Sequence, residues 1–346
     1  MKKEDVFKGK KVYELGEEWQ KAPVTKEEGR ACKHRLERRW YRRMIEINIL
    51  MIVVVISLLV TNMDENKRLG KQALEQFKRD LKEENIGLID SWDSEPAEDA
   101  SSEGKASEGK AEEKQEKLTK DDIPFEIQAL FYGLIITVVG YLALYYLYAK
   151  YRSSAVRITE RNFPEIYAMV EDFARRLGIK TPKAYVIQQS GVLNAFSAFL
   201  FRKQWICIHA ELFEVAYREH QDMDVLAFVI AHEMAHIYYG HATLHYNLPI
   251  WFSRIVPVFS DIASRTREYS CDRLAQRLTG SDGLDAMLAL VVDRHLYKMV
   301  DKEDYIEEMK AQKGFFLWCV NMVASHPVMN KRVLALVCGR GSGKLY

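Results

Sequence analysis

The segment DVLAFVIAHEMAHIYYGH, Asp224–His241, carries the residues with the clearest capacity for chemistry. His232 and His236 are four residues apart, so on a helix they share one face with Cβ atoms about 5 to 6 Å apart. Both imidazoles can then reach one metal ion at roughly 2.0 to 2.1 Å. Glu233, next to the first histidine, approaches the open position of such a metal and can accept a proton from a bound water. The spacing HExxH therefore predicts a catalytic zinc site.

The seven residues VLAFVIA before the motif are apolar on all sides, which predicts a buried helix. Unpaired polar side chains on a buried helix are costly, and a metal ion gives them a partner. A structural cluster of His and Glu side chains that satisfy one another is the alternative interpretation.

A hydrolytic zinc needs a third protein ligand and leaves its fourth position to water. The pattern HExxHxxGxxH does not supply that ligand, because Tyr239 and Ala242 stand where its glycine and third histidine would be. The downstream string Arg267–Ala275, REYSCDRLA, offers a carboxylate in Glu268 on a second expected helix. Asp272 lies one turn later and could accept the other ring N–H of a ligating histidine. Two solvated carboxylates on a surface helix are the competing interpretation.

Three further features are weaker. His241 and His245 are four residues apart, but a polar helix end is a better interpretation than a second metal pair. Cys271 is expected to be a small core residue. GRGSGK at 339–344 lacks one spacer residue of a phosphate loop and has no Ser or Thr after its lysine, so it is interpreted as a tail.

Two segments predict transmembrane helices: residues 44–63 and residues 127–149. Each is about 20 residues long and strongly apolar, which at roughly 1.5 Å per residue crosses a hydrocarbon core of about 30 Å. A buried helix of a soluble protein is the alternative. Four tyrosines crowd one end of the second segment, as in the aromatic belt of a membrane interface: Tyr141, Tyr145, Tyr146 and Tyr148.

Charge predicts the orientation of these spans. Basic residues crowd the approach to the first span, so residues 1–43 are expected to be a cytosolic N-terminal segment. Residues 64–126 are acidic, with a low-complexity Ser/Glu/Gly/Lys middle that cannot build a core, and are expected to form an external loop. Residues 153–346 then return to the cytoplasm as the zinc metallopeptidase domain, which agrees with five cysteines that form no CxxC pair.

The 346 residues carry 50 Lys and Arg against 49 Asp and Glu, so no global field favours nucleic acid, and none is expected as a partner. In the last domain, Asn162–Leu177 has helical spacing and ends at Gly178. AYVIQQ, NAFSAFLF and QWICIHA follow as short strands, and almost everything after Glu211 is helical. The predicted fold class is α+β, mainly α, with a small antiparallel sheet.

The ordered set of motifs resembles the membrane-bound, glutamate-liganded zinc endopeptidases that include HtpX and the CAAX prenyl proteases of type 1. The matches are HEMAH at 232–236, GH at 240–241, Glu268 and Asp272 with Ser264 and Arg265 upstream, NAF at 194–196, and SHP at 325–327 followed by Arg332. They cover about residues 155–338.

The resemblance implies a zincin-type domain with one Zn²⁺ per chain, Glu268 as third ligand and Glu233 as general base. It also implies that Asn194 and His326 line the substrate cleft. The protein would be integral to a membrane, expected to be a bacterial plasma membrane, with the catalytic domain in the cytoplasm. Its substrates would be proteins or peptides, membrane proteins among them, in quality control or regulated proteolysis. The strand near NAFSAF would bind the substrate backbone by β-augmentation.

One departure from the HtpX pattern is that no further spans lie between HEMAH and Glu268. Only residues 248–259 are apolar there, too few to cross a bilayer, and they either dip into the interface or form a helix–helix loop. The competing function is a catalytically inactive, zinc-stabilised membrane scaffold. Glu233 argues against it, since a structural site needs no free carboxylate beside an open position.

Overall fold

The computed structural model describes residues 6–8, 10–15, 17–83, 125–188, 195–200, 203–251, 253, 257–324, 326–338 and 343–345. Contacts divide the chain into two units. The first comprises Met1–Met51 and Ala143–Tyr346 and holds every motif that carries chemistry; the second is Ile52–Leu142.

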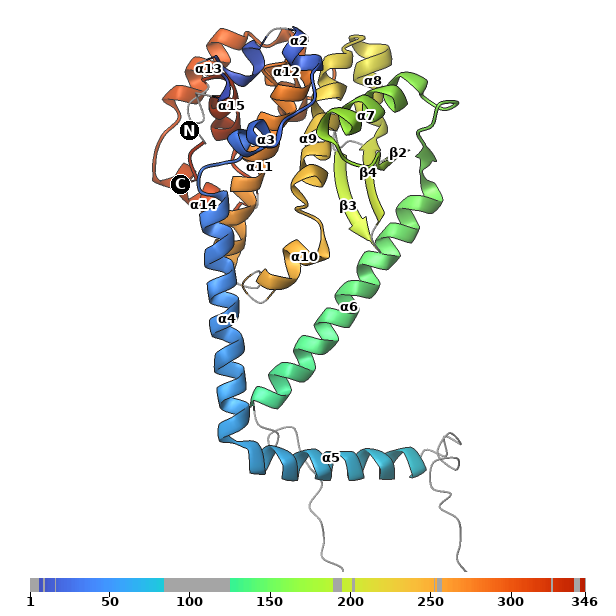
Figure 1. Cartoon of the computed structure of the whole chain (residues 1–346), viewed down its shortest axis with the longest axis vertical. Coiled ribbons are helices and arrows are strands. Elements are labelled where there is room, and N and C mark those ends of the chain that lie inside the picture. The colour runs from blue at the N-terminus through green and yellow to red at the C-terminus, as the bar shows by residue number, and fades with distance from the viewer. Residues whose placement is uncertain are drawn as a thin grey trace, which may run out of the picture. The chain divides into compact units, whose positions relative to one another are not determined.

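The first unit is mainly helical, as predicted, and its small sheet lies at one side of it (Figure 1). Its complete helices are α2 (Glu17–Lys21), α3 (Lys26–Cys32), α7 (Pro164–Leu177), α8 (Ala210–Glu214), α9 (Met223–Tyr239), α10 (Leu244–Asn247), α11 (Pro257–Thr279), α12 (Leu284–Val292), α13 (Lys302–Ala311), α14 (Phe315–Val323) and α15 (Met329–Val337). Shorter helical turns lie at Val12–Glu14, Val215–Glu219, Leu248–Ile250 and Tyr297–Met299. The predicted helix that ends at Gly178 is confirmed as α7.

Helix α9 is the central helix of this unit. The Asp222 side chain caps its start by accepting the Val225 N–H at 3.3 Å, and Gly240 ends it in the left-handed conformation at φ +72°. Most of its side chains are buried, which confirms the buried helix predicted from its apolar sequence. It packs extensively against α11, so the HExxH motif and the downstream carboxylates lie on neighbouring helices.

The sheet is mixed, so the predicted antiparallel sheet is wrong. Its strands are β1 (Val156–Arg157), β2 (Lys183–Ile187), β3 (Ala195–Leu200) and β4 (Lys203–His209), in the order β1-β2-β4-β3. β2 pairs with β4 in parallel, whereas β1 with β2 and β3 with β4 are antiparallel. The reason is burial: four consecutive side chains of β4, residues 205–208, are buried, so this strand takes an inner place and β3 lies at the edge.

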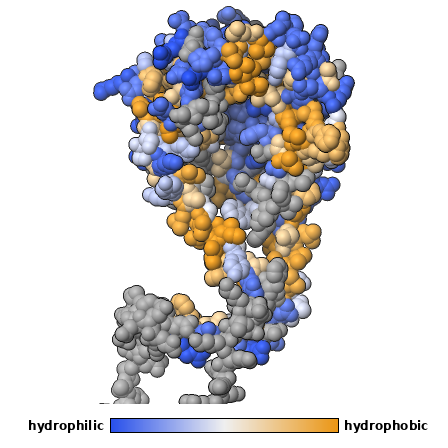
Figure 2. Space-filling model, turned by 180° about the vertical axis from the view of Figure 1, so that it is seen from behind, coloured by the Kyte–Doolittle hydropathy of each residue, from blue (hydrophilic) through white to orange (hydrophobic). Residues whose placement is uncertain are grey.

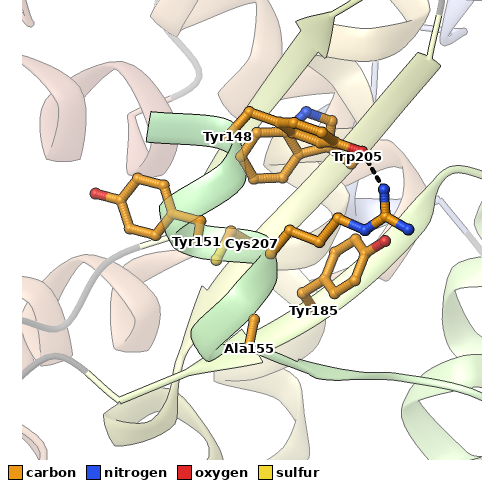
Figure 3. Close-up of a pocket in the computed structure, with 7 residues that line it drawn as sticks. Tyr148, Tyr151, Ala155, Tyr185, Trp205 and Cys207 are labelled. Atoms are coloured by element: carbon orange, nitrogen blue, oxygen red, sulfur yellow. Dashed lines mark hydrogen bonds between the residues drawn. The ribbon is translucent and has the colours of Figure 1, made fainter. Parts of the chain in front are cut away.

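The last turns of helix α6 (Phe125–Ser154) pack on the sheet through an aromatic cluster (Figure 3). The Tyr148 ring lies 5.5 Å from that of Trp205, and the Tyr151 ring lies 5.0 Å from that of Phe196 on β3. Tyr148, expected in an interfacial belt, therefore supports the sheet, while Tyr146 is exposed. The end of α6 is thus fixed against the edge strand.

Among the described residues, two helices are long and apolar enough to cross a membrane: α4 (Glu37–Thr61) and residues Ile127–Ser154 of α6. Most of their apolar side chains are exposed, Leu50 by 62% and Ile136 by 68%, whereas a core helix of a soluble protein would hide them. The predicted spans 44–63 and 127–149 overlap these helices, and membrane association is supported.

Beyond the first of these helices, the second unit contains α5 (Met63–Glu83). The first part of the predicted external loop is therefore helical, in keeping with its many Glu, Lys, Arg and Leu residues. The low-complexity stretch of that loop lies outside the described residues.

Candidate metal centre and cleft

His232 and His236 on α9 converge with Glu268 on α11. The two histidine Nε2 atoms are 3.3 Å apart, and the Glu268 carboxylate oxygens lie 3.4 Å from His232 Nε2 and 3.5 Å from His236 Nε2. A tetrahedral ion with bonds of roughly 2.0 to 2.1 Å separates its ligands by about 3.3 to 3.4 Å. The three donor atoms thus have the spacing of one face of such a tetrahedron, and they form a group able to hold a metal ion.

The charges of this group are balanced among buried side chains. Burial alone would lower the pKa of His232, but the carboxylates of Asp272 and Glu268 outweigh it and raise that pKa to about 10. Burial would likewise raise the pKa of Glu268, but the two histidines hold it well below its usual range. Without an ion, the cluster therefore keeps a proton on His232 against the Glu268 carboxylate, and a divalent cation can take the place of that proton.

Asp272 orients His232 from behind. Its Oδ1 atom lies 2.8 Å from His232 Nδ1, so His232 turns its Nε2 atom toward the centre. Arg332 donates two hydrogen bonds to Asp272, at 2.9 and 2.6 Å, and all three side chains are buried. Burial would raise the pKa of Asp272, but Arg332 and His232 outweigh it and keep the carboxylate charged. Arg332 entered the sequence motif without a role, and the structure gives it this one.

His236 is oriented in turn by His241, which corrects the prediction of a polar helix end. His241 is buried, and its Nδ1 atom lies 3.1 Å from His236 Nδ1. The left-handed turn at Gly240 explains this position, because it reverses the chain and returns His241 toward the helix. His245 instead lies near Thr243, at 3.4 Å, and takes no part in the centre.

Glu37 contacts His241 on the side away from His236. Its place in the site was not predicted from the sequence. His241 Nε2 lies 3.5 Å from the Glu37 carboxylate, which also accepts hydrogen bonds from Lys33 and Ser270. Burial lowers the pKa of His241 to about 3, so its imidazole is neutral and carries one N–H. With that N–H directed to Glu37, His241 Nδ1 is free to accept the His236 Nδ1–H. The only sequence signals were the Gly-His pair after the motif and one acidic residue in a basic segment.

A second group of possible metal donors, His236, His241 and Cys271, shares His236 with the first. Cys271 is fully buried in the main core, as predicted for a small core residue, and burial raises the pKa of its thiol well above the usual range. His241 and Cys271 do not line the cleft described next.

The first group opens into a cleft of about 350 Å³. Glu233 lines this cleft beside the three donor residues, and residues 195–197 of edge strand β3 form another wall. His326 also lines it, with its Nδ1 atom 3.6 Å from the Glu268 carboxylate. Asn194 lies outside the described residues. The remaining walls are largely apolar: Phe228, Val229, Met287 and Leu290.

Comparisons with known proteins point to a peptidase family. Residues 160–248 match the family model described as Peptidase family M48. The chain is 25% identical over 243 residues to a protein named Protease HtpX homolog from Archaeoglobus fulgidus, covering 60% of this chain and 69% of that relative. A protein of the same name from Halobacterium salinarum is 36% identical over 78 residues, or 22% of this chain and 25% of the relative.

No solved structure matches the chain. The resemblance expected from the motifs is confirmed: the chain is similar to HtpX-like proteases of peptidase family M48. The region matched by the family model contains HEMAH but ends before Glu268, which the fold brings to the two histidines.

Proposed function

We propose that the protein is a membrane-anchored zinc metalloendopeptidase. The observation that carries this proposal is the triangle of donor atoms from His232, His236 and Glu268, open to a cleft that Glu233 also lines. Bound there, Zn²⁺ would polarise a scissile carbonyl and lower the pKa of a water molecule. Glu233 accepts the proton of the attacking water and delivers it to the leaving amine.

The substrate is proposed to bind as an added strand on β3. β3 pairs with β4 on one side only among the described strands, and its residues 195–197 face the cleft. Main-chain hydrogen bonds to such an edge hold an extended peptide without regard to its sequence. The apolar walls formed by Phe228, Met287 and Leu290 favour an apolar side chain next to the cleaved bond. Asn194 and His326 are proposed to contact the substrate.

Zinc content tests the centre directly. Purified protein is expected to hold about one Zn²⁺ per chain, because two histidines and one carboxylate satisfy a catalytic site. His232→Ala is expected to lose the ion, and His245→Ala, on the exposed side of α10, to keep it. Elemental analysis measures both, and removal of the ion by a chelator should abolish peptide cleavage until zinc is returned. Less than about half an equivalent in gently purified wild type, unchanged by His232→Ala, would refute the zinc site.

The catalytic domain is proposed to face the cytoplasm, where the protease would act on misfolded or regulated membrane proteins. Seven basic residues before the first span support this orientation: Arg30, Lys33, Arg35, Arg38, Arg39, Arg42 and Arg43. In intact cells, a membrane-impermeant thiol reagent should label a cysteine introduced in the range 101–116 and spare a cysteine tag fused after Tyr346. The reverse pattern would mean that the topology is inverted.

A further inference from the structure

Helix α14 turns its polar side chain inward and its apolar side chains outward. Its one amide side chain, Asn321, is fully buried, where it donates a hydrogen bond to the Leu345 carbonyl at 2.8 Å and accepts the Val328 N–H at 3.1 Å. Phe316 and Val323 are instead exposed, by 83% and 76%. A helix of a water-soluble domain does the opposite. An apolar patch therefore marks the surface where α14 lies (Figures 1 and 2), of the kind that indicates a membrane or a partner.

Polar contacts fix this orientation. Arg265 of α11, which is fully buried, donates hydrogen bonds to the carbonyls of Met322 at 3.3 Å and Ala324 at 2.6 Å, at the end of α14. A cation at the C-terminal end of a helix is favourable, and the Asn321 contacts hold the same face inward. The apolar face is thus turned outward by the packing of the domain.

Helix α14 lies beside the start of the first membrane helix. Met322 of α14 and Trp40 of α4 pack on one hydrophobic cluster, which includes Ile262 and Tyr269 of α11. Trp40 and Tyr41 come just before the predicted span 44–63, where aromatic side chains mark a membrane–water interface. The apolar patch is therefore at the level where α4 is expected to enter the bilayer.

A basic groove of about 870 Å³ adjoins α14. Its cationic lining residues are Arg35, Lys310, Lys313, Lys331 and Lys344, and no Asp or Glu among the residues that the structure describes lines it. Within the described part of the chain, none of the four lysines forms an ion pair. Burial lowers the pKa of Lys331, and the positive charges of Arg265 and Lys344 lower it further. A bound anion would relieve this repulsion, and Leu317 and Trp318 give the groove an apolar wall.

We propose that α14 lies in the membrane interface with its apolar face among the lipids, and that the basic groove binds the phosphate of an anionic phospholipid of the same bilayer. Free phosphate shares the charge of that headgroup but offers nothing to cover the apolar face, so the lipid is the ligand that fits both features. The proposal rests on the membrane anchoring proposed above.

The test uses the full-length protein in lipid nanodiscs with an environment-sensitive fluorophore at Phe316→Cys. Cys319→Ala and Cys338→Ala remove the two accessible thiols, and the other three cysteines are buried. Nitroxide-labelled acyl chains should quench this probe by roughly half or more when α14 is immersed. A probe at Val53→Cys in α4 reports anchoring, and a probe at Val291→Cys, an exposed apolar position on α12, should stay unquenched.

The headgroup is tested by comparing phosphatidylcholine with a mixture that contains about 30 mol% phosphatidylglycerol. Quenching at position 316 should rise in the mixture. The preference of α14 for the anionic mixture over phosphatidylcholine should fall roughly fivefold for each lysine replaced in Lys310→Gln with Lys313→Gln. The matched pair Lys180→Gln and Lys183→Gln, exposed elsewhere on the domain, should leave it unchanged. Millimolar inorganic phosphate should not compete if the ligand is the lipid.

Each other result overturns the proposal. Quenching at position 53 without quenching at position 316 would leave the anchoring intact and remove α14 from the membrane. An unquenched probe at position 53 would remove the anchoring itself. Equal quenching in both lipids, unaffected by the groove lysines, would refute the headgroup site. A probe at position 316 already shielded in detergent, in proportion to protein concentration, would assign the patch to a second copy of the chain.

Discussion

Glu233→Gln is expected to lower the rate of peptide cleavage by about 10²- to 10⁴-fold and to leave the zinc content at one per chain. Glutamine keeps the size of the side chain and one oxygen acceptor but cannot take up the proton of the attacking water. Glu233 lines the cleft yet does not belong to the group of three metal donors, so its substitution should not disturb them. Cleavage of a fluorogenic peptide, together with elemental analysis of the same sample, measures both quantities.

The control for this variant is Asp224→Asn, which makes the same carboxylate-to-amide change in the first turn of the same helix, at a residue that does not line the cleft. It should cleave as fast as wild type. Hydrolysis by Glu233→Gln within about tenfold of wild type, with zinc fully bound, would exclude the general base. Equal zinc in wild type and in Glu233→Gln, with no cleavage of any peptide by either, would instead favour the inactive scaffold.

The core of the candidate site could be predicted because its geometry is local. Residues four apart on a helix share a face, so HExxH places His232 beside His236 wherever the helix lies. The same argument sets Asp272 one turn from Glu268 on α11. Only the approach of the two helices had to come from the fold, and the burial of α9 against α11 provides it.

The contacts that hold His241 and Asp272 in place behind the ligands could not be predicted, because they join residues far apart in sequence. Glu37 is 204 residues from His241, and Arg332 is 60 residues from Asp272. The prediction of the strand pairing was wrong for a related reason. All the strands were expected to be antiparallel, but β4, whose residues 205–208 are all buried, lies between β2 and β3 and pairs with β2 in parallel.

Glu268→Gln is expected to lose metal and activity together, unlike Glu233→Gln. Glu268 supplies the negative charge of the donor group, and its oxygens lie 3.4 and 3.5 Å from the two histidines. A neutral amide is a poorer ligand and does not compensate the charge of a divalent cation, so zinc should dissociate more readily. Competition with a chelator of known affinity measures this loss without reference to cleavage.

Asp261→Asn is the matched control for this second variant, because it lies on the same helix α11 and outside both the metal group and the cleft. It should bind zinc as wild type does. The zinc affinity of Asp272→Asn should lie between those of Glu268→Gln and Asp261→Asn. Asp272 orients His232 without belonging to the donor group, and such partners typically contribute about 10- to 100-fold in affinity. Full zinc retention by Glu268→Gln would require another third ligand. His241 would then be the first to substitute, because it belongs with His236 to the second group of possible metal donors.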